Sequence, residues 1–163
     1  MKLAYADPPY LGCAKFYDHP EAHIYDTVRA HADLLARLDA GYDGWAYSMS
    51  STSLPAILPY APEGVRIAAW VKPFAAFKRN VRIAYTWEPV LFKPGRDSSK
   101  LGASVGRDHL AQSITLKRGL TGAKHENFCV WILTLLGYVP GDEVDDLFPG
   151  TGVMGRVVEG RRE

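Results

Sequence analysis

The chain has 163 residues, of which 47% are hydrophobic and 23% charged, and a formal net charge of +1, which is typical of one soluble globular domain. No apolar run approaches the roughly 20 residues needed to cross a bilayer, and the N-terminus lacks the ordered regions of a signal peptide. The spacing of Cys13 and Cys129 predicts two reduced thiols, so we expect a cytoplasmic protein without a membrane segment.

Short apolar runs alternate with amphipathic segments along the chain. Strands are expected at residues 2–6, 45–49, 65–71, 81–93 and 144–148, with Pro89 bending or bulging the fourth. Helices are expected at residues 26–40, 54–62 and 126–136, and from about residue 153. This alternation predicts an α/β domain with a largely parallel sheet.

Apolar positions at helical spacing predict the buried faces of two helices. In the first helix they are Val28, Ala32, Leu35 and Leu38. In the helix at 126–136 they are Phe128, Trp131, Ile132, Leu135 and Leu136. Three tryptophans in apolar patterns are also predicted to lie in the core: Trp70, Trp87 and Trp131.

Asp7-Pro8-Pro9-Tyr10 directly follows the strand expected at residues 2–6. Proline lacks the N–H that a sheet ladder requires, so the strand must end here. A carboxylate, backbone carbonyls and an aromatic ring then lie at a strand's carboxyl end, where open α/β sheets bind their ligands. The tetrapeptide is suited to holding a flat substrate that forms hydrogen bonds.

A second motif, Asp146-Leu147-Phe148-Pro149-Gly150-Thr151-Gly152, follows the last expected strand. Glycines after a strand allow the backbone to approach a ligand closely. By itself, a GxG sequence fits a plain strand-to-helix turn about equally well.

Together the two motifs resemble the catalytic and cofactor motifs of the S-adenosylmethionine-dependent amino-methyltransferases. Their order, with the catalytic motif first, resembles the circularly permuted beta class. Lys124-His125 and the Val139–Asp142 segment are similar to the lead-in to that group's cofactor motif. The resemblance implies a Rossmann-like methyltransferase sheet that is mostly parallel, with a reversed edge hairpin and helices on both faces.

The family acts on exocyclic amines, chiefly N6 of adenine and N4 of cytosine. The resemblance implies catalytic roles for Asp7, Pro8, Pro9 and Tyr10, in which Asp7 and the Pro8 carbonyl accept the amine hydrogens and Tyr10 stacks on the base. It implies that the cofactor S-adenosylmethionine is bordered by Asp146, Phe148, Gly150, Thr151 and Gly152, with Lys124 nearby. Asp rather than Ser before Pro-Pro-Tyr favours adenine.

Positive charge is concentrated in the middle of the chain. Residues 64–124 contain 12 Lys/Arg against 3 Asp/Glu, whereas the segments on either side are acidic. A basic region of this kind is typical of a polyanion-binding face, and DNA is the favoured partner; a solvated basic surface is the alternative. The candidate nucleic-acid-binding residues are Lys78, Arg79, Arg82, Lys100, Arg107, Lys117 and Arg118.

Two features depart from the family pattern. Residues 94–123 predict a mobile basic loop, with a short helical turn near 107–113, in place of a full target-recognition domain, so residues 1–163 are expected to form a single domain. Only eleven residues follow Gly152, so the sheet is expected to lack the family's last two strands. Residues 144–148 would then be an exposed edge that a second copy or a partner chain covers.

These features leave several functions open. The leading hypothesis is a compact adenine-N6 DNA methyltransferase of phage or prokaryotic type. The alternatives are a non-catalytic or half-enzyme nucleic-acid-binding subunit and an amino-methyltransferase acting on RNA or on cytosine N4. His19 and His23 have i,i+4 spacing, but Pro20 separates them and no nearby ligand set completes a metal site, so no metal is expected.

Overall fold

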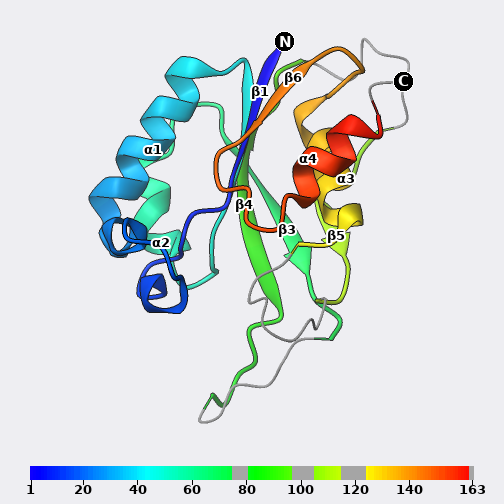
Figure 1. The fold of residues 1–163 in the computed structure, drawn as a ribbon. Coiled ribbons are helices and arrows are strands. Elements are labelled where there is room, and N and C mark those ends of the chain that lie inside the picture. The colour runs from blue at the N-terminus through cyan, green and yellow to red at the C-terminus, as the bar shows by residue number, and fades with distance from the viewer. Residues whose placement is uncertain (75–80, 97–104, 115–123, 162–163) are drawn as a thin grey trace.

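A computed structural model describes residues 1–74, 81–96, 105–114 and 124–161. Its centre is a six-stranded sheet with helices on both faces (Figure 1). No helix in these ranges is both long and apolar enough to span a bilayer.

The sheet has the strand order β5-β3-β4-β2-β1-β6. Its strands are β1 (Lys2–Ala6), β2 (Gly44–Ser48), β3 (Arg66–Val71), β4 (Trp87–Lys93), β5 (His109–Ala111) and β6 (Glu143–Asp146). Only β4 of these six is antiparallel to its neighbours β2 and β3. The mostly parallel sheet with a reversed hairpin is therefore confirmed, although β5 adds a further strand outside that hairpin.

The described residues contain four α-helices and three short 3-10 segments. Helices α1 (Val28–Gly41) and α2 (Leu54–Ile57) lie on one face, and α3 (Glu126–Leu136) and α4 (Val153–Glu159) lie on the other (Figure 1). The 3-10 segments are η1 (Ala14–Phe16), η2 (Ala22–Asp26) and η3 (Leu58–Tyr60). Thr27 accepts a hydrogen bond from the Ala30 N–H and caps α1, and Gly137, with φ of 71°, ends α3 in the left-handed conformation.

Alternation along the strands sends side chains into two separate cores. On β1, Leu3 and Tyr5 pack toward α3 and α4, whereas Ala4 and Ala6 pack toward α1. All five residues predicted for the α3 stripe are buried. In α1 the buried residues are His31, Leu34, Leu35 and Leu38, so the predicted face was placed too far toward Val28 and Ala32.

Four predictions for the middle of the chain are wrong in detail. Residues 109–111 form β5, where a loop or helical turn was expected, because the open edge of β3 provides ladder partners for them. Residues 81–86 are not a strand, and Trp87 is 38% exposed rather than in the core. Pro89 pairs with Ala69 in unbroken register and causes no bulge.

Asp142 connects the N-terminus to Arg96, which follows β4, and to the turn before β6. Its carboxylate, almost fully buried, accepts hydrogen bonds from the Arg96 guanidinium at 2.6 and 2.9 Å and from the Met1 ammonium at 2.8 Å. It also accepts one from the Val139 N–H at 2.9 Å. Although burial opposes the charged form, these donors hold the pKa of Asp142 well below its usual range.

Replacing Asp142 by Asn should lower the free energy of unfolding by about 2–3 kcal/mol at neutral pH, since the Arg96 charge loses its partner. A carboxyl with a depressed folded pKa contributes its full stabilisation above its unfolded pKa of about 4, and this contribution is lost progressively as the pH falls from there through the lower folded pKa. The difference between parent and Asp142→Asn should therefore shrink in acid. Urea denaturation of both proteins between neutral pH and the acid range below about pH 4 measures this difference.

Asp33→Asn is the matched control, because it removes an exposed i,i+4 ion pair with Arg29 and should cost less than about 0.5 kcal/mol. Equal losses from the two variants would contradict the role assigned to Asp142.

Candidate functional site

The two sequence motifs meet because their strands are neighbours. β1 and β6 pair in parallel, with Tyr5 opposite Asp146, and the Leu147 N–H donates to the Tyr5 carbonyl at 3.0 Å. The carboxyl ends of the two strands therefore leave the sheet side by side. Asp7 follows one strand and the Asp146–Gly152 loop follows the other.

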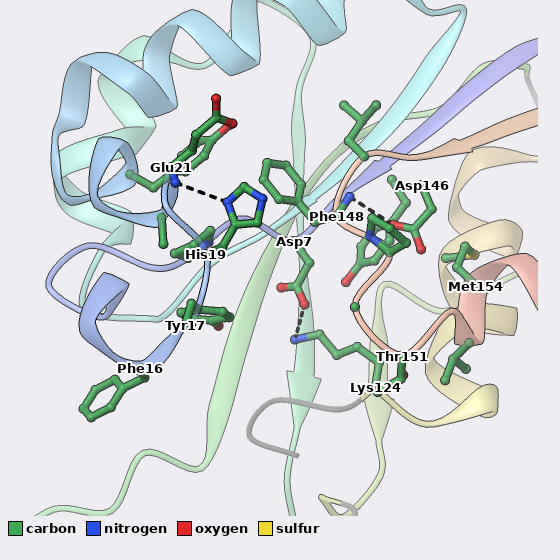
Figure 2. Close-up of a pocket in the computed structure, with 18 of the residues that line it drawn as sticks. Asp7, Phe16, Tyr17, His19, Glu21, Lys124, Asp146, Phe148, Thr151 and Met154 are labelled. Atoms are coloured by element: carbon green, nitrogen blue, oxygen red, sulfur yellow. Dashed lines mark hydrogen bonds and ion pairs between the residues drawn. The ribbon is translucent and has the colours of Figure 1, made fainter. Parts of the chain in front are cut away.

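A cavity of about 1050 Å³ lies at this edge of the sheet, at the upper end of the range for small-molecule sites. One wall is formed by Asp7, Pro9 and Lys124, and a second by the loop after β6 (Figure 2). The segment containing η1 and η2 provides a third wall, with Phe16, Tyr17 and His19 (Figure 2). Tyr25 of η2 also lines the cavity.

Asp7 has polar partners at both carboxylate oxygens. The Lys124 ammonium lies 3.2 Å from Oδ2, and the Tyr10 hydroxyl donates to Oδ1 at 3.2 Å. Lys124 also donates to the Tyr10 hydroxyl oxygen at 3.1 Å. Because Lys124 immediately precedes the cap of α3, this helix fixes the position of the ammonium beside Asp7.

Glu88 on β4 extends the cluster. Its Oε2 lies 3.0 Å from the Tyr10 hydroxyl, as the alternative acceptor to Asp7 for the single Tyr10 proton, and 3.5 Å from the Lys124 ammonium. Its Oε1 pairs with Lys72, which follows β3. Two carboxylates and two ammonium groups thus meet with no net charge, and the side chains of Lys72 and Lys124 are each only 10% exposed.

The cluster sets the protonation of its members. Burial raises the pKa of Asp7, and the nearby Glu88 carboxylate adds to this rise while Lys124 opposes it. Burial disfavours the Lys124 ammonium, yet Asp7 and Glu88 together raise the pKa of Lys124 above its ordinary value. Burial also disfavours the charged form of Glu88 and would raise its pKa. Lys124 and Lys72 outweigh burial, so the pKa of Glu88 is lowered.

Aromatic rings surround the Lys124 ammonium. It lies 5.3 Å from the centroid of Trp70, 5.5 Å from Phe128 and 5.7 Å from Tyr10. Cation–π attraction at these distances favours the charged form and compensates part of the cost of burying it.

The loop after β6 contains two glycines in the left-handed backbone region. Gly150 and Gly152 have positive φ values of 48° and 69°, which other residues rarely adopt. The Phe148 N–H donates to Asp146 Oδ1 at 3.3 Å, and burial raises the pKa of Asp146. Arg156 donates to the Thr151 carbonyl at 2.8 Å and braces the turn.

A series of hydrogen bonds through buried side chains supports the wall formed by η1 and η2. Tyr25 packs edge-on against Phe148 with centroids 5.3 Å apart, and its carbonyl accepts from His31 Nε2 at 2.8 Å. His31 Nδ1 must then accept from the Tyr47 hydroxyl. Because burial lowers the pKa of His31, the ring is neutral in this arrangement.

Most of the residues predicted for the catalytic and cofactor motifs are brought together. The cavity is lined by Asp7, Pro9, Lys124, Asp146, Phe148, Gly150 and Thr151. Tyr10 joins through its hydrogen bonds, whereas Pro8 and Gly152 adjoin the cavity in the chain without lining it. Lys124 was expected beside the cofactor loop, but its ammonium forms an ion pair with Asp7.

The predicted nucleic-acid residues are only partly described. Arg82 and Arg107 are exposed and lie outside the cavity lining. Lys78, Arg79, Lys100, Lys117 and Arg118 fall outside the described residues. In the described part of the chain, no group of histidine, cysteine and carboxylate side chains is arranged to hold a metal ion.

Sequence reasoning missed Glu88, Lys72 and the η1–η2 wall. A carboxylate within the apolar run at 87–92 and a lysine between a strand and Pro73 were the available signals. Neither reveals a partner, because the cluster joins residues that are distant along the chain.

The comparisons with known proteins support the fold. No protein-family model and no curated protein matches the chain. Among solved structures, the fold resembles a methyltransferase fold. The crystal structure of the M1.HpyAVI-SAM complex is similar with a TM-score of 0.57 and 18% identity, over 99% of this chain and 77% of that one. A second crystal structure of M1.HpyAVI gives a TM-score of 0.58 and 17% identity, over 98% and 76%.

Replacing Lys124 by Met should destabilise the protein by about 2–4 kcal/mol near pH 8, since two partly buried carboxylates lose a shared cation. The loss should be smaller near pH 5, because the carboxylates freed from Lys124 bind protons there more readily. Urea denaturation of both proteins at the two pH values measures this.

Lys93→Met is the control, because the Lys93–Asp39 pair is more exposed and should contribute less than about 1 kcal/mol. A Lys124→Met protein as stable as the parent at both pH values would contradict the energetic role of the cluster.

Proposed function

We propose that the protein transfers a methyl group from S-adenosylmethionine to the N6 amine of adenine in DNA. The observation that carries this proposal is the single cavity bordered by both Asp7 and the loop after Asp146. A donor held by the loop and an amine held by Asp7 would meet inside it. The similarity of the fold to the M1.HpyAVI-SAM complex supports the same assignment.

The loop after β6 is the proposed cofactor end. Asp146, Phe148, Gly150, Thr151 and Gly152 would border the donor, since they combine a carboxylate, an aromatic ring and a closely approachable backbone. The neighbouring Leu147 and Met154 add the apolar lining that small-molecule sites generally have. When bound, S-adenosylmethionine supplies an electrophilic methyl group.

Asp7 is the proposed catalytic centre. An adenine amine is a weak nucleophile because its lone pair is delocalised into the ring. Hydrogen bonds from its two N–H groups to Asp7 and to the Pro8 carbonyl would localise that pair on nitrogen. A preorganised carboxylate also stabilises the positive charge that develops on the nitrogen, and Asp7 is placed to take up the proton released.

Tyr10 and Pro9 shape the space around the base. The Tyr10 ring would stack on adenine and align the amine, as aromatic side chains do in sites that receive flipped-out bases. Exposed basic residues such as Arg82 and Arg107 would contact phosphates. Residues 1–163 would act as one domain, with the 94–123 region in place of a separate target-recognition domain.

A second candidate is a half-enzyme subunit that binds nucleic acid and needs a partner. The observation that favours it is the position of β6 at the edge of the described sheet, directly beside the cavity. A second copy or another chain pairing with this edge would extend the wall of the cofactor site. RNA and cytosine N4 are the remaining substrates to be compared.

Transfer of labelled methyl groups to DNA that lacks adenine methylation tests the proposal. Asp7→Ala should lower kcat by about a hundredfold or more, because it removes the carboxylate that activates the amine. Asp33→Asn, a surface change on α1, should retain parental activity.

Digestion of the product to nucleosides should place the label on N6-methyladenine. Label on cytosine, or equal activity on RNA, would contradict the substrate assignment. An Asp7→Ala protein as active as the parent would contradict the catalytic one.

A further inference from the structure

Two donors of the protein already bind Asp7, the residue proposed to accept the substrate amine. A carboxylate that accepts an amine hydrogen must offer it a carboxylate lone pair. In the structure, Oδ2 faces the Lys124 ammonium and Oδ1 accepts from Tyr10. Because each carboxylate oxygen has two lone pairs, Lys124 and Tyr10 compete with the substrate amine without excluding it, and transfer of either group to another acceptor would favour amine binding.

Glu88 provides that acceptor without a large movement. Its Oε2 is 3.0 Å from the Tyr10 hydroxyl, compared with 3.2 Å for Asp7 Oδ1. The Lys124 ammonium is 3.5 Å from the same Oε2, compared with 3.2 Å for Asp7 Oδ2. Both groups thus lie between two carboxylates at nearly equal distances.

Tyr10 can donate to only one of the two carboxylates at a time, whereas Lys124 can donate to both. A tyrosine hydroxyl has a single proton, so Tyr10 donates either to Asp7 or to Glu88 at a given moment. Lys124 has three protons and already uses one on the Tyr10 oxygen. A small shift toward Glu88 would release Asp7 while every donor keeps an acceptor.

Lys72 fixes the position of the Glu88 carboxylate. It pairs with Oε1 and leaves Oε2 to face Tyr10 and Lys124. The Lys72 ammonium is itself held 4.7 Å from the centroid of Trp70 on β3. Glu88 is therefore a fixed, charged acceptor on a central strand of the sheet rather than a mobile surface group.

We propose that Glu88 is a positioning residue that takes over the Tyr10 hydroxyl and the Lys124 ammonium when a substrate amine binds to Asp7. This inference rests on the proposed methyl-transfer function. It assigns to Glu88 a task that neither sequence motif contains. Two positive and two negative charges remain in the cluster throughout, so the exchange creates no unpaired charge.

Glu88→Gln separates this role from simple packing, because it preserves size while removing the charge. Lys124 then has only Asp7 as a charged partner and competes with the substrate amine. We expect kcat for methyl transfer to fall by about tenfold or more, with KM for S-adenosylmethionine nearly unchanged.

The pH profile gives a second readout. Asp7 is faced by Lys124, Tyr10 and Glu88, and loss of the Glu88 charge favours ionised Asp7. The acid limb of kcat should therefore move to lower pH in Glu88→Gln, which a purely structural defect would not cause. Glu88→Asp should keep the limb in place and retain more activity than Glu88→Gln. Glu63→Gln changes an exposed carboxylate in the turn before β3, and its kcat and pH profile should match those of the parent.

A crystal structure of the parent protein with S-adenosylhomocysteine and an adenine-containing oligonucleotide tests the exchange directly. Tyr10 and Lys124 should contact Glu88, and Asp7 should contact the amine. Retention of both groups on Asp7 would overturn the inference, as would parental kcat and pH profile in Glu88→Gln. A parent protein that transfers no methyl group overturns the proposed function itself. If the parent is active, retention of Tyr10 and Lys124 on Asp7, or parental kinetics in Glu88→Gln, overturns only the role of Glu88.

Discussion

The ion pair between Lys124 and Asp7 is the interaction on which the arrangement of this site depends. It joins the start of α3 to the end of β1, and Glu88 and Lys72 link the same cluster to β4 and β3. Each of these charges would be costly to bury alone, so their mutual pairing is what permits a carboxylate at the cavity wall. The cluster also fixes where Asp7 points relative to the loop after β6.

Sheet order explains how the two ends of the chain form one site. The parallel pairing of β1 with β6 places Asp7 and Asp146, which are 139 positions apart in sequence number, at the same carboxyl edge. Ligands of open α/β sheets bind outside this edge, and the cavity lies there. The fold itself is similar to that of the M1.HpyAVI-SAM complex.

Local signals predicted the fold well and the site only in part. β1 ends at Ala6 as expected, because the backbone constraint of proline acts within a few residues, whereas β6 ends at Asp146 rather than at the expected Phe148. The pairing of β5 with β3 and the exposure of Trp87 depend on which strands become neighbours, which no local pattern encodes. Glu88 was missed for the same reason: its partners Lys124 and Tyr10 reach it only in the folded sheet.

The central claim is that the cavity beside Asp7 and the Asp146–Gly152 loop holds S-adenosylmethionine, and isothermal titration calorimetry tests it most directly. The parent should bind one equivalent of the donor. Gly150→Val should bind at least about tenfold more weakly, because a β-branched residue is strained at a φ of 48°. Absence of binding to the correctly folded parent would contradict the claim that this chain forms the donor site by itself.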